Sequence, residues 1–289
     1  MKSSDAFAKY GFTHFVVANI DFLGQRCRLE KLSQFGIDEL NDNKQAITLQ
    51  KDTFLAVANI RDALNDLMYD EGREADLKCF SEAERAAVEE ILRSRTINQS
   101  FSDSLVYHID ISDEPAACAV NVWTVLQALA YVFPIALSAH TPLRGGIALG
   151  WAGHIGENEI YGPAPLCAHL LEQNAAQYPR IVLDSRTPAF MRELASLNAD
   201  DVQSRIARLF AAWSLELVTT DDDDRPILHY LSERQLREED TEFQSYVLPK
   251  ARDFARSELE AYTKTNNLKL APRYARLNAY FDKYMRAVL

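Results

Sequence analysis

The hydrophobic positions of this 289-residue chain follow two different spacings, and the order of these spacings predicts its elements. Five of the six residues at 15–20 are apolar, and this run ends at Asp21 and is followed closely by Gly24. Such a run predicts a buried strand that leads through a glycine turn into a helix. From 51 to 69 the apolar residues recur every three or four positions, which predicts a second helix.

The next elements are marked by a capping pattern and by a change of period. Ser81 and Glu84 match a capping box, which predicts a helix that starts there. Two short β-rich runs then flank Ser102, Asp103 and Ser104, and this arrangement predicts a hairpin. A long apolar stretch follows and predicts a helix at about 117–133.

The remaining elements complete an α+β pattern. In chain order we expect two strands with glycine-rich turns at 142–162, a helix at 163–177, a strand at 180–184, a helix capped by Thr187 before Pro188, and two strands around an acidic turn at 214–231. This order is typical of a ferredoxin-like βαββαβ sheet with inserted helices.

The chain becomes wholly helical after Leu231. Two apolar stripes at helical spacing run from Phe243 to Tyr262 and from Tyr274 to Val288. We therefore expect a domain at 1–231 and a helical C-terminal extension at 232–289. The stripes pack either on the domain or on a second copy of the chain.

Charge and hydropathy narrow the possible partners. The formal net charge is −11 and the pI about 5.1, which excludes broad electrostatic binding to nucleic acid or to anionic membranes. The most apolar region, 120–139, is interrupted by Asn121, Gln127 and Pro134, so a buried helix explains it better than a membrane span.

The cysteines and the N-terminus point to a reducing compartment. Four cysteines lie far apart and form no CxxC pair: Cys27, Cys79, Cys118 and Cys167. A zinc site or a disulfide framework is not expected from this spacing, and the first residues contain no apolar stretch of signal-peptide length. We expect a cytoplasmic protein.

Two carboxylates mark the candidate chemistry. Asp21 closes the first strand and Asp103 lies in the hairpin turn, and these elements are neighbours in a βαββαβ sheet. Without a cation two such carboxylates repel, whereas with Mg²⁺ or Mn²⁺ they become oxygen ligands. Two ions about 3.5–4 Å apart can hold both the attacking and the leaving oxygen of a phosphoryl transfer. The plainer alternative is that Asp21 caps a helix and Asp103 only forms a turn.

The turn after Asp21 is suited to phosphate. Gly24 and the backbone amides of Leu23, Gln25 and Arg26 stand at a predicted helix N-terminus. Such amides form a cradle for anions. Together with the carboxylates, this turn predicts a site for a metal-bound polyphosphate.

Four motifs carry a resemblance to a known family. In chain order these motifs are NIDFLG, FSDSLV, LRGGIALG and EIYGPAPLCAHLLE. Their order and spacing resemble the catalytic domains of class III nucleotidyl cyclases, over roughly residues 12–231. The divergent helices and the segment TDDDDRPILHYL are most similar to the pyrimidine cyclases of bacterial Pycsar antiphage systems.

The resemblance implies a reaction and a set of roles. The enzyme would be a homodimer that converts UTP to 3′,5′-cyclic UMP and pyrophosphate, a second messenger for a separate effector in phage defence. Asp21, Asp103 and the Phe22 carbonyl would bind two Mn²⁺ or Mg²⁺ ions, and Arg144 would contact the polyphosphate. Gln99 and Glu159 match base-reading positions, with Arg95 and Tyr107 as further candidates.

The chain also departs from the better-known members. Leu166 and Leu170 stand where adenylyl and guanylyl cyclases carry Asn and Arg. Another donor, such as His169 or an arginine from elsewhere in the chain, would have to replace them, or activity would be compromised. The alternatives are a cytidylate cyclase that makes cyclic CMP, an adenylyl or guanylyl cyclase, and a catalytically silent nucleotide-binding regulator. A further alternative is an interaction protein that acts through 233–289.

Overall fold

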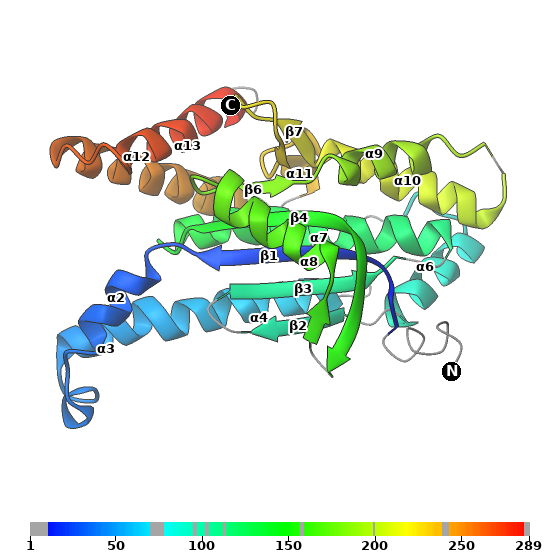
Figure 1. The fold of residues 1–289 in the computed structure, drawn as a ribbon. Helices are drawn as coiled ribbons and strands as arrows, with labels where there is room; N and C mark the ends of the chain where they lie inside the picture. Colours follow the sequence, from blue (N-terminus) through cyan, green and yellow to red (C-terminus); the bar gives the residue numbers. More distant parts are fainter. Residues whose placement is uncertain are drawn as a thin grey trace.

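The computed structural model describes residues 11–69, 78–94, 97–101, 104–111, 114–156, 159–198, 200–238 and 243–285. Within them the chain forms a mixed β-sheet with helices on both faces, which confirms the predicted α+β class (Figure 1). The strands are β1 (Thr13–Phe22), β2 (Ile97–Phe101), β3 (Ser104–Asp110), β4 (Leu143–Gly156), β5 (Glu159–Tyr161), β6 (Ile181–Leu183), β7 (Val218–Thr220) and β8 (Pro226–Leu228).

The strand order places β1 in the interior of the sheet, between β3 and β4. The described strands follow the order β2-β3-β1-β4-β6-β8-β7, and β5 pairs with β4. The pairs β2–β3, β3–β1 and β1–β4 are antiparallel, and the pair β4–β6 is parallel. Because β3 lies between β1 and β2, the chain contains the split βαβ arrangement that the βαββαβ order predicts.

Helices account for most of the remaining described residues. They are α2 (Gln25–Leu32), α3 (Lys44–Gln50), α4 (Ala56–Tyr69), α6 (Glu82–Ser94), α7 (Pro115–Ser138), α8 (Pro163–Leu170), α9 (Arg186–Ala195), α10 (Val202–Glu216), α11 (Glu233–Glu238), α12 (Leu248–Lys264) and α13 (Ala271–Tyr284). Shorter turns are 3₁₀ (Ile37–Glu39) or π-helical (Lys51–Leu55, Leu171–Ala175 and Phe243–Val247). The capping box before α6 is confirmed, since the Ser81 N–H donates to Glu84 Oε2 at 2.8 Å.

Two expectations for the helices were wrong. Thr187 does not cap α9, which begins one residue earlier; its N–H instead donates to the Asp184 carboxylate at 3.0 Å, so the capping oxygen comes from the residue after β6. Helices α3 and α10 were not predicted, and the last three residues of α10, 214–216, fall where we expected a strand.

Strand β1 is buried on both faces. One face is apolar from Val16 to Phe22, and the other carries polar residues towards the C-terminal end of the strand. One alternating set lies in the main core beneath α4 and α7: Val16, Ala18, Ile20 and Phe22. The other set begins with Phe15 and Val17 in a small core under α8 and continues with Asn19 and Asp21. Asp21 therefore closes the strand on the α8 side, where the apolar packing ends.

Helix α7 forms the centre of the main core. It is the one helix in the described part of the chain that is long and apolar enough to cross a membrane, and 89% of its most apolar window is buried inside the protein. Residue Pro134 lies inside this helix, so the helix is longer than the predicted 117–133. The expectation of a buried helix is confirmed.

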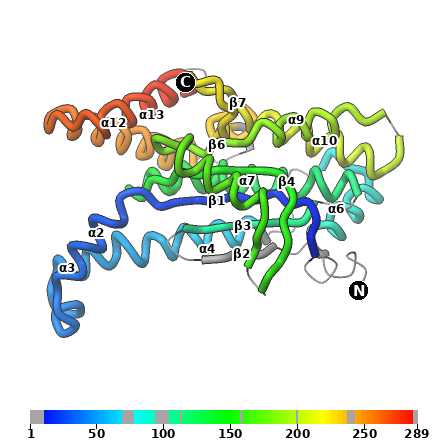
Figure 2. Tube along the Cα trace, in the orientation of Figure 1, coloured from blue at the N-terminus to red at the C-terminus, as the bar shows by residue number. Residues whose placement is uncertain are grey.

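The C-terminal helices pack on the rest of the chain (Figure 2). Helix α12 lies on α7, and the side chains of both C-terminal stripes enter the main core. The Tyr280 hydroxyl lies 2.8 Å from His229 Nδ1, and the Tyr284 hydroxyl lies 3.0 Å from Thr219 Oγ1 on β7. The apolar stripes are thus covered within one chain as far as Met285, where the described residues end, and the boundary at Leu231 stays a prediction.

A buried arginine binds two carboxylates of the acidic turn between β7 and β8. The side chain of Arg180 is 3% exposed and donates to both Asp221 and Asp223. The same guanidinium lowers the pKa of Asp223 through its hydrogen bonds. Charge-assisted hydrogen bonds from Arg180, the residue before β6, therefore hold this run of aspartates against the sheet.

The buried His108 is expected to make the folded protein less stable in acid. It is fully buried on β3, and in the described part of the chain neither ring nitrogen has a partner. Burial, and then the neighbouring His154, lowers the pKa of His108 to about 4. Its neutral form stabilises the fold above the ordinary pKa of 6.5, and this contribution is lost as the pH falls from 6.5 towards 4.

We therefore expect the variant His108→Leu to lose less stability in acid than the parent chain. The difference in free energy of unfolding between the two proteins should change by about 3 kcal/mol between pH 7 and pH 4. Urea unfolding at both pH values measures it. Parallel pH curves for the two proteins would contradict the assignment.

Candidate functional site

Polar side chains from β1, β4 and the end of α8 meet on one face of the sheet. The register pairs Asp21 with Ser104 on β3 and with Arg144 on β4. Glu172, in the π-helical turn after α8, reaches the same place. The cluster therefore lies where β1 ends and the helix α2 is about to begin.

Arg144 is shared by two carboxylates. Its Nε lies 2.9 Å from Asp21 Oδ2, and its Nη2 lies 2.7 Å from Glu172 Oε1. The Glu172 side chain is 5% exposed, whereas those of Arg144 and Asp21 are 24% and 28% exposed. Among the described residues, Arg144 Nη1 and Asp21 Oδ1 have no partner. The cluster thus keeps one donor and one acceptor for a ligand, and it carries more negative than positive charge.

Asn19 and His169 extend the cluster along β1. The Asn19 amide nitrogen lies 3.0 Å from His169 Nδ1, which accepts this hydrogen bond when the imidazole proton is on Nε2. Asn19 Oδ1 is buried without a partner in the part of the chain that the structure describes. His169 is 48% exposed and also lies 3.7 Å from Glu172 Oε2. His169 is therefore oriented by its neighbours while one ring edge stays accessible.

Two motif glycines let α8 approach the sheet. A Cβ on Gly146 would collide with the Ala168 carbonyl oxygen and would lie 2.9 Å from the Glu172 nitrogen. Gly162 has a φ of +148°, and a Cβ there would lie 2.8 Å from the Ala152 Cα. The close approach of helix and sheet is what brings Glu172 to Arg144.

The turn after Asp21 is formed as predicted, with one correction. Gly24 has a φ of +82°, and α2 begins at the next residue. The Leu23 N–H does not face a free site, because it donates to the Pro142 carbonyl at 2.9 Å. Gln25 instead contributes a side-chain amide whose nitrogen and oxygen are both buried without a partner in the described ranges.

The structure does not describe the predicted hairpin carboxylate or one of the base-reading candidates. Asp103 and Arg95 lie outside the described residues. Ser104, the residue after Asp103, is directly opposite Asp21 in the register of β1 and β3. The metal assignment of Asp103 therefore stays a prediction.

The other base-reading candidates lie on β2, β3 and β5. Gln99 occupies the register position opposite Tyr107, and Tyr107 is fully buried in the main core with its hydroxyl 2.9 Å from Asn65 Oδ1. Glu159 pairs with Gly156 at the far end of β4, roughly 40 Å along the strand from Arg144. Tyr107 is a core residue, Glu159 lies far from Arg144 within one chain, and the base-reading role of Gln99 stays a prediction.

Sequence reasoning missed Glu172 and Asn19. The signal for Asn19 is that it is the one polar residue among 15–20. The only signal for Glu172 is a carboxylate placed three residues after His169 at the end of an otherwise apolar helix. Leu166 and Leu170, on the same helix, are 58% and 45% exposed. These two side chains therefore form an apolar surface beside the polar cluster.

The donor set is suited to a hard cation but is incomplete within the described residues. No group of three or more His, Cys, Asp or Glu side chains that could hold a metal occurs there. The partnerless oxygens Asp21 Oδ1 and Asn19 Oδ1 are of the type that Mg²⁺ and Mn²⁺ prefer. Mg²⁺ commonly takes one or two carboxylates and completes its shell with substrate phosphates and water.

Three comparisons with known proteins were made, and none of them gives a match. A scan against protein-family models finds no matching family, and neither a search of curated proteins nor a search of solved structures finds a match.

Proposed function

We propose that this protein is a metal-dependent nucleotidyl cyclase that converts UTP to 3′,5′-cyclic UMP and pyrophosphate. The register of the sheet is the observation that carries the proposal. It sets Asp21 between Arg144 and Ser104, so the residue that follows Asp103 in the chain is the cross-strand neighbour of Asp21. A carboxylate that can bind a metal ion, an arginine that can bind phosphate and a glycine turn before a helix then lie together. Phosphoryl transfer depends on such groups to position the phosphates and stabilise their charge.

Each residue has a physical role in the proposed reaction. Asp21, the Phe22 carbonyl and Asp103 would hold two Mg²⁺ or Mn²⁺ ions, which stabilise charge on the leaving group and lower the pKa of the ribose hydroxyl. Arg144 donates its partnerless Nη1 to the polyphosphate and keeps its orientation through Glu172. Gln25 presents its buried amide at the start of α2.

The proposal includes a cytoplasmic homodimer. The exposed Leu166 and Leu170 are surfaces that a second copy would cover, and Gln99 and Glu159 would read the base from the partner chain. Within this proposal UTP is favoured and CTP is the next substrate. The cyclic nucleotide would act through a separate effector in phage defence.

A second candidate is a nucleotide-binding regulator without catalysis. It is favoured by the absence of hydrogen-bonding groups at Leu166 and Leu170 and by Arg144, which already neutralises Asp21. His169 would be the replacement donor in an active enzyme.

The test is to incubate the purified protein with Mn²⁺ and each of ATP, GTP, CTP and UTP, and to identify the products by mass spectrometry. We expect cyclic UMP and pyrophosphate from UTP. Cyclic CMP alone would move the base assignment to cytosine, and cyclic AMP or cyclic GMP would overturn the pyrimidine assignment. Nucleotide binding without pyrophosphate release would favour the regulator.

A further inference from the structure

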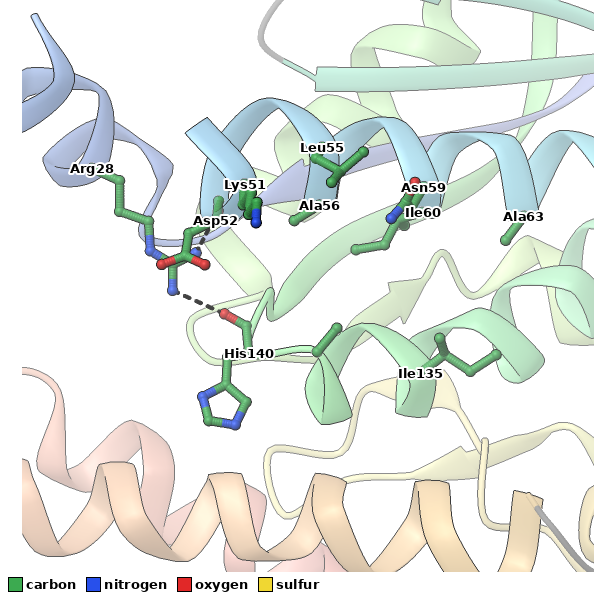
Figure 3. A pocket seen from close by; sticks show the side chains of 11 residues that line it. Arg28, Lys51, Asp52, Leu55, Ala56, Asn59, Ile60, Ala63, Ile135 and His140 are labelled. Atoms are coloured by element: carbon green, nitrogen blue, oxygen red, sulfur yellow. Dashed lines mark hydrogen bonds between the residues drawn. The ribbon is translucent and has the colours of Figure 1, made fainter. Parts of the chain in front are cut away.

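A cavity of about 460 Å³ lies between α2, α4 and the C-terminal end of α7 (Figure 3). Its volume is within the range of small-molecule sites. The floor is apolar and formed by Ala56, Ile60, Ala63, Ile135 and Ala139. Three of these residues recur along one side of α4, so the floor is elongated. It suits an apolar body that lies along the helix.

Charged groups gather at one end of this cavity. Figure 3 shows Arg28, Lys51 and Asp52 at the end nearest α2, and Ala63 and Ile135 at the other. Lys51 has no ion pair or hydrogen bond from its side chain in the described part of the chain. Two cations and one carboxylate leave a local excess of positive charge in a protein whose net charge is −11. This end therefore suits an anionic group.

Arg28 joins the cavity to the turn of the proposed active site. Its Nη1 donates to the Asp52 carbonyl at 2.9 Å and its Nη2 to the His140 carbonyl at 3.0 Å. Arg28 thereby ties α2 to both walls of the cavity. A guanidinium has five N–H donors, so an anion can bind Arg28 without breaking this clamp. Helix α2 follows Gly24 directly, and its position sets that of the turn.

We propose that the cavity binds a small amphipathic monoanion, with a carboxylate or sulfonate at Arg28 and Lys51 and an apolar body on the floor between α4 and α7. The bound molecule adds contacts to both sides of the Arg28 clamp and so orders α2. Its effect on catalysis rests on the proposed function: an ordered turn would lower the KM for the nucleoside triphosphate.

Binding is tested on the full chain without any activity measurement. The fluorescence of anilinonaphthalene sulfonate is titrated and compared with that of phenylnaphthylamine, which has the same ring system without the sulfonate. We expect saturable binding of one sulfonate probe per chain and weaker binding of the uncharged probe. Lys51→Gln should weaken the sulfonate about two- to fivefold, since the ion pair is exposed. The same change at the exposed Lys44 on α3 should leave the affinity unchanged.

The apolar floor is tested by Ala63→Phe, which fills the cavity. This variant should abolish saturable binding while circular dichroism and thermal unfolding show an intact fold. If Ala63→Phe does not fold, the comparison of Lys51→Gln with Lys44→Gln decides alone. Absence of saturable binding to the parent chain, or equal affinities in Lys51→Gln and Lys44→Gln, would overturn the site.

The coupling to α2 is measured by hydrogen exchange. The bound sulfonate probe should slow exchange of the amides between Cys27 and Leu32, and unchanged exchange there at saturation would overturn the clamp. These readouts separate the two proposals. Binding with the expected variant pattern in a chain that makes no cyclic nucleotide would keep the cavity and refute the cyclase, and cyclic nucleotide synthesis without binding would do the reverse.

Discussion

Replacing Asp21 with Asn is expected to reduce cyclic nucleotide formation at least about 100-fold while leaving the protein folded. The substitution removes the negative charge that a divalent ion needs, but it keeps the shape of the side chain and one oxygen. Stability should change by no more than about 1 kcal/mol, because the ion pair is partly exposed and Arg144 retains Glu172. Pyrophosphate release with UTP and Mn²⁺, together with thermal unfolding, measures both effects.

A matched control separates this role from a general effect of charge. Asp62 lies on α4, is 62% exposed and is paired with Arg61, so Asp62→Asn also removes an ion-paired carboxylate. Its activity should equal that of the parent protein. An Asp21→Asn variant that keeps more than half of the parent activity would refute the metal assignment. A variant that loses Mn²⁺-dependent nucleotide binding as well as turnover would support it further.

The apolar run at residues 15–20 made strand β1 predictable. The apolar run that ends at Asp21 is buried on both faces as expected, and the hairpin that follows pairs with it. The glycine at Gly24 has the positive φ that the turn suggested. These features depend on a few neighbouring residues, so a single sequence carries enough information to predict them.

The partners of the site residues depend on tertiary packing and could not be predicted in this way. Glu172 reaches Arg144 only because Gly146 lets the end of α8 lie on β4. The Leu23 amide is taken by Pro142, which is distant in sequence. No local pattern specifies either contact, and the same holds for the cavity beside Arg28. The sequence therefore predicted the strand and the turn of the candidate site, but not the partners of its side chains.

Gly146 is expected to be the glycine of β4 that tolerates substitution least. In Gly146→Ala the new methyl group would meet backbone atoms, the Ala168 carbonyl oxygen and the Glu172 nitrogen, which cannot turn aside as a flexible side chain can. Helix α8 must then shift away from the sheet. We expect a loss of about 3 kcal/mol in the free energy of unfolding, measured by urea denaturation. The pair between Arg144 and Glu172 should be lost with it, so the proposed activity falls too.

Gly150 on the same strand provides the control, because it lies on the same face and also beneath α8. A Cβ there would lie 3.5 Å from Arg186 Nη1 and 3.6 Å from the Ala164 Cβ, which are ordinary contacts. Gly150→Ala should therefore change stability by less than about 1 kcal/mol, in part because alanine restricts the unfolded chain. Equal effects of the two substitutions would mean that strand propensity, and not the approach of α8, requires glycine in this motif. A large effect at Gly146 alone would show that glycine is needed there so that α8, and the turn after it that contains Glu172, can pack on β4.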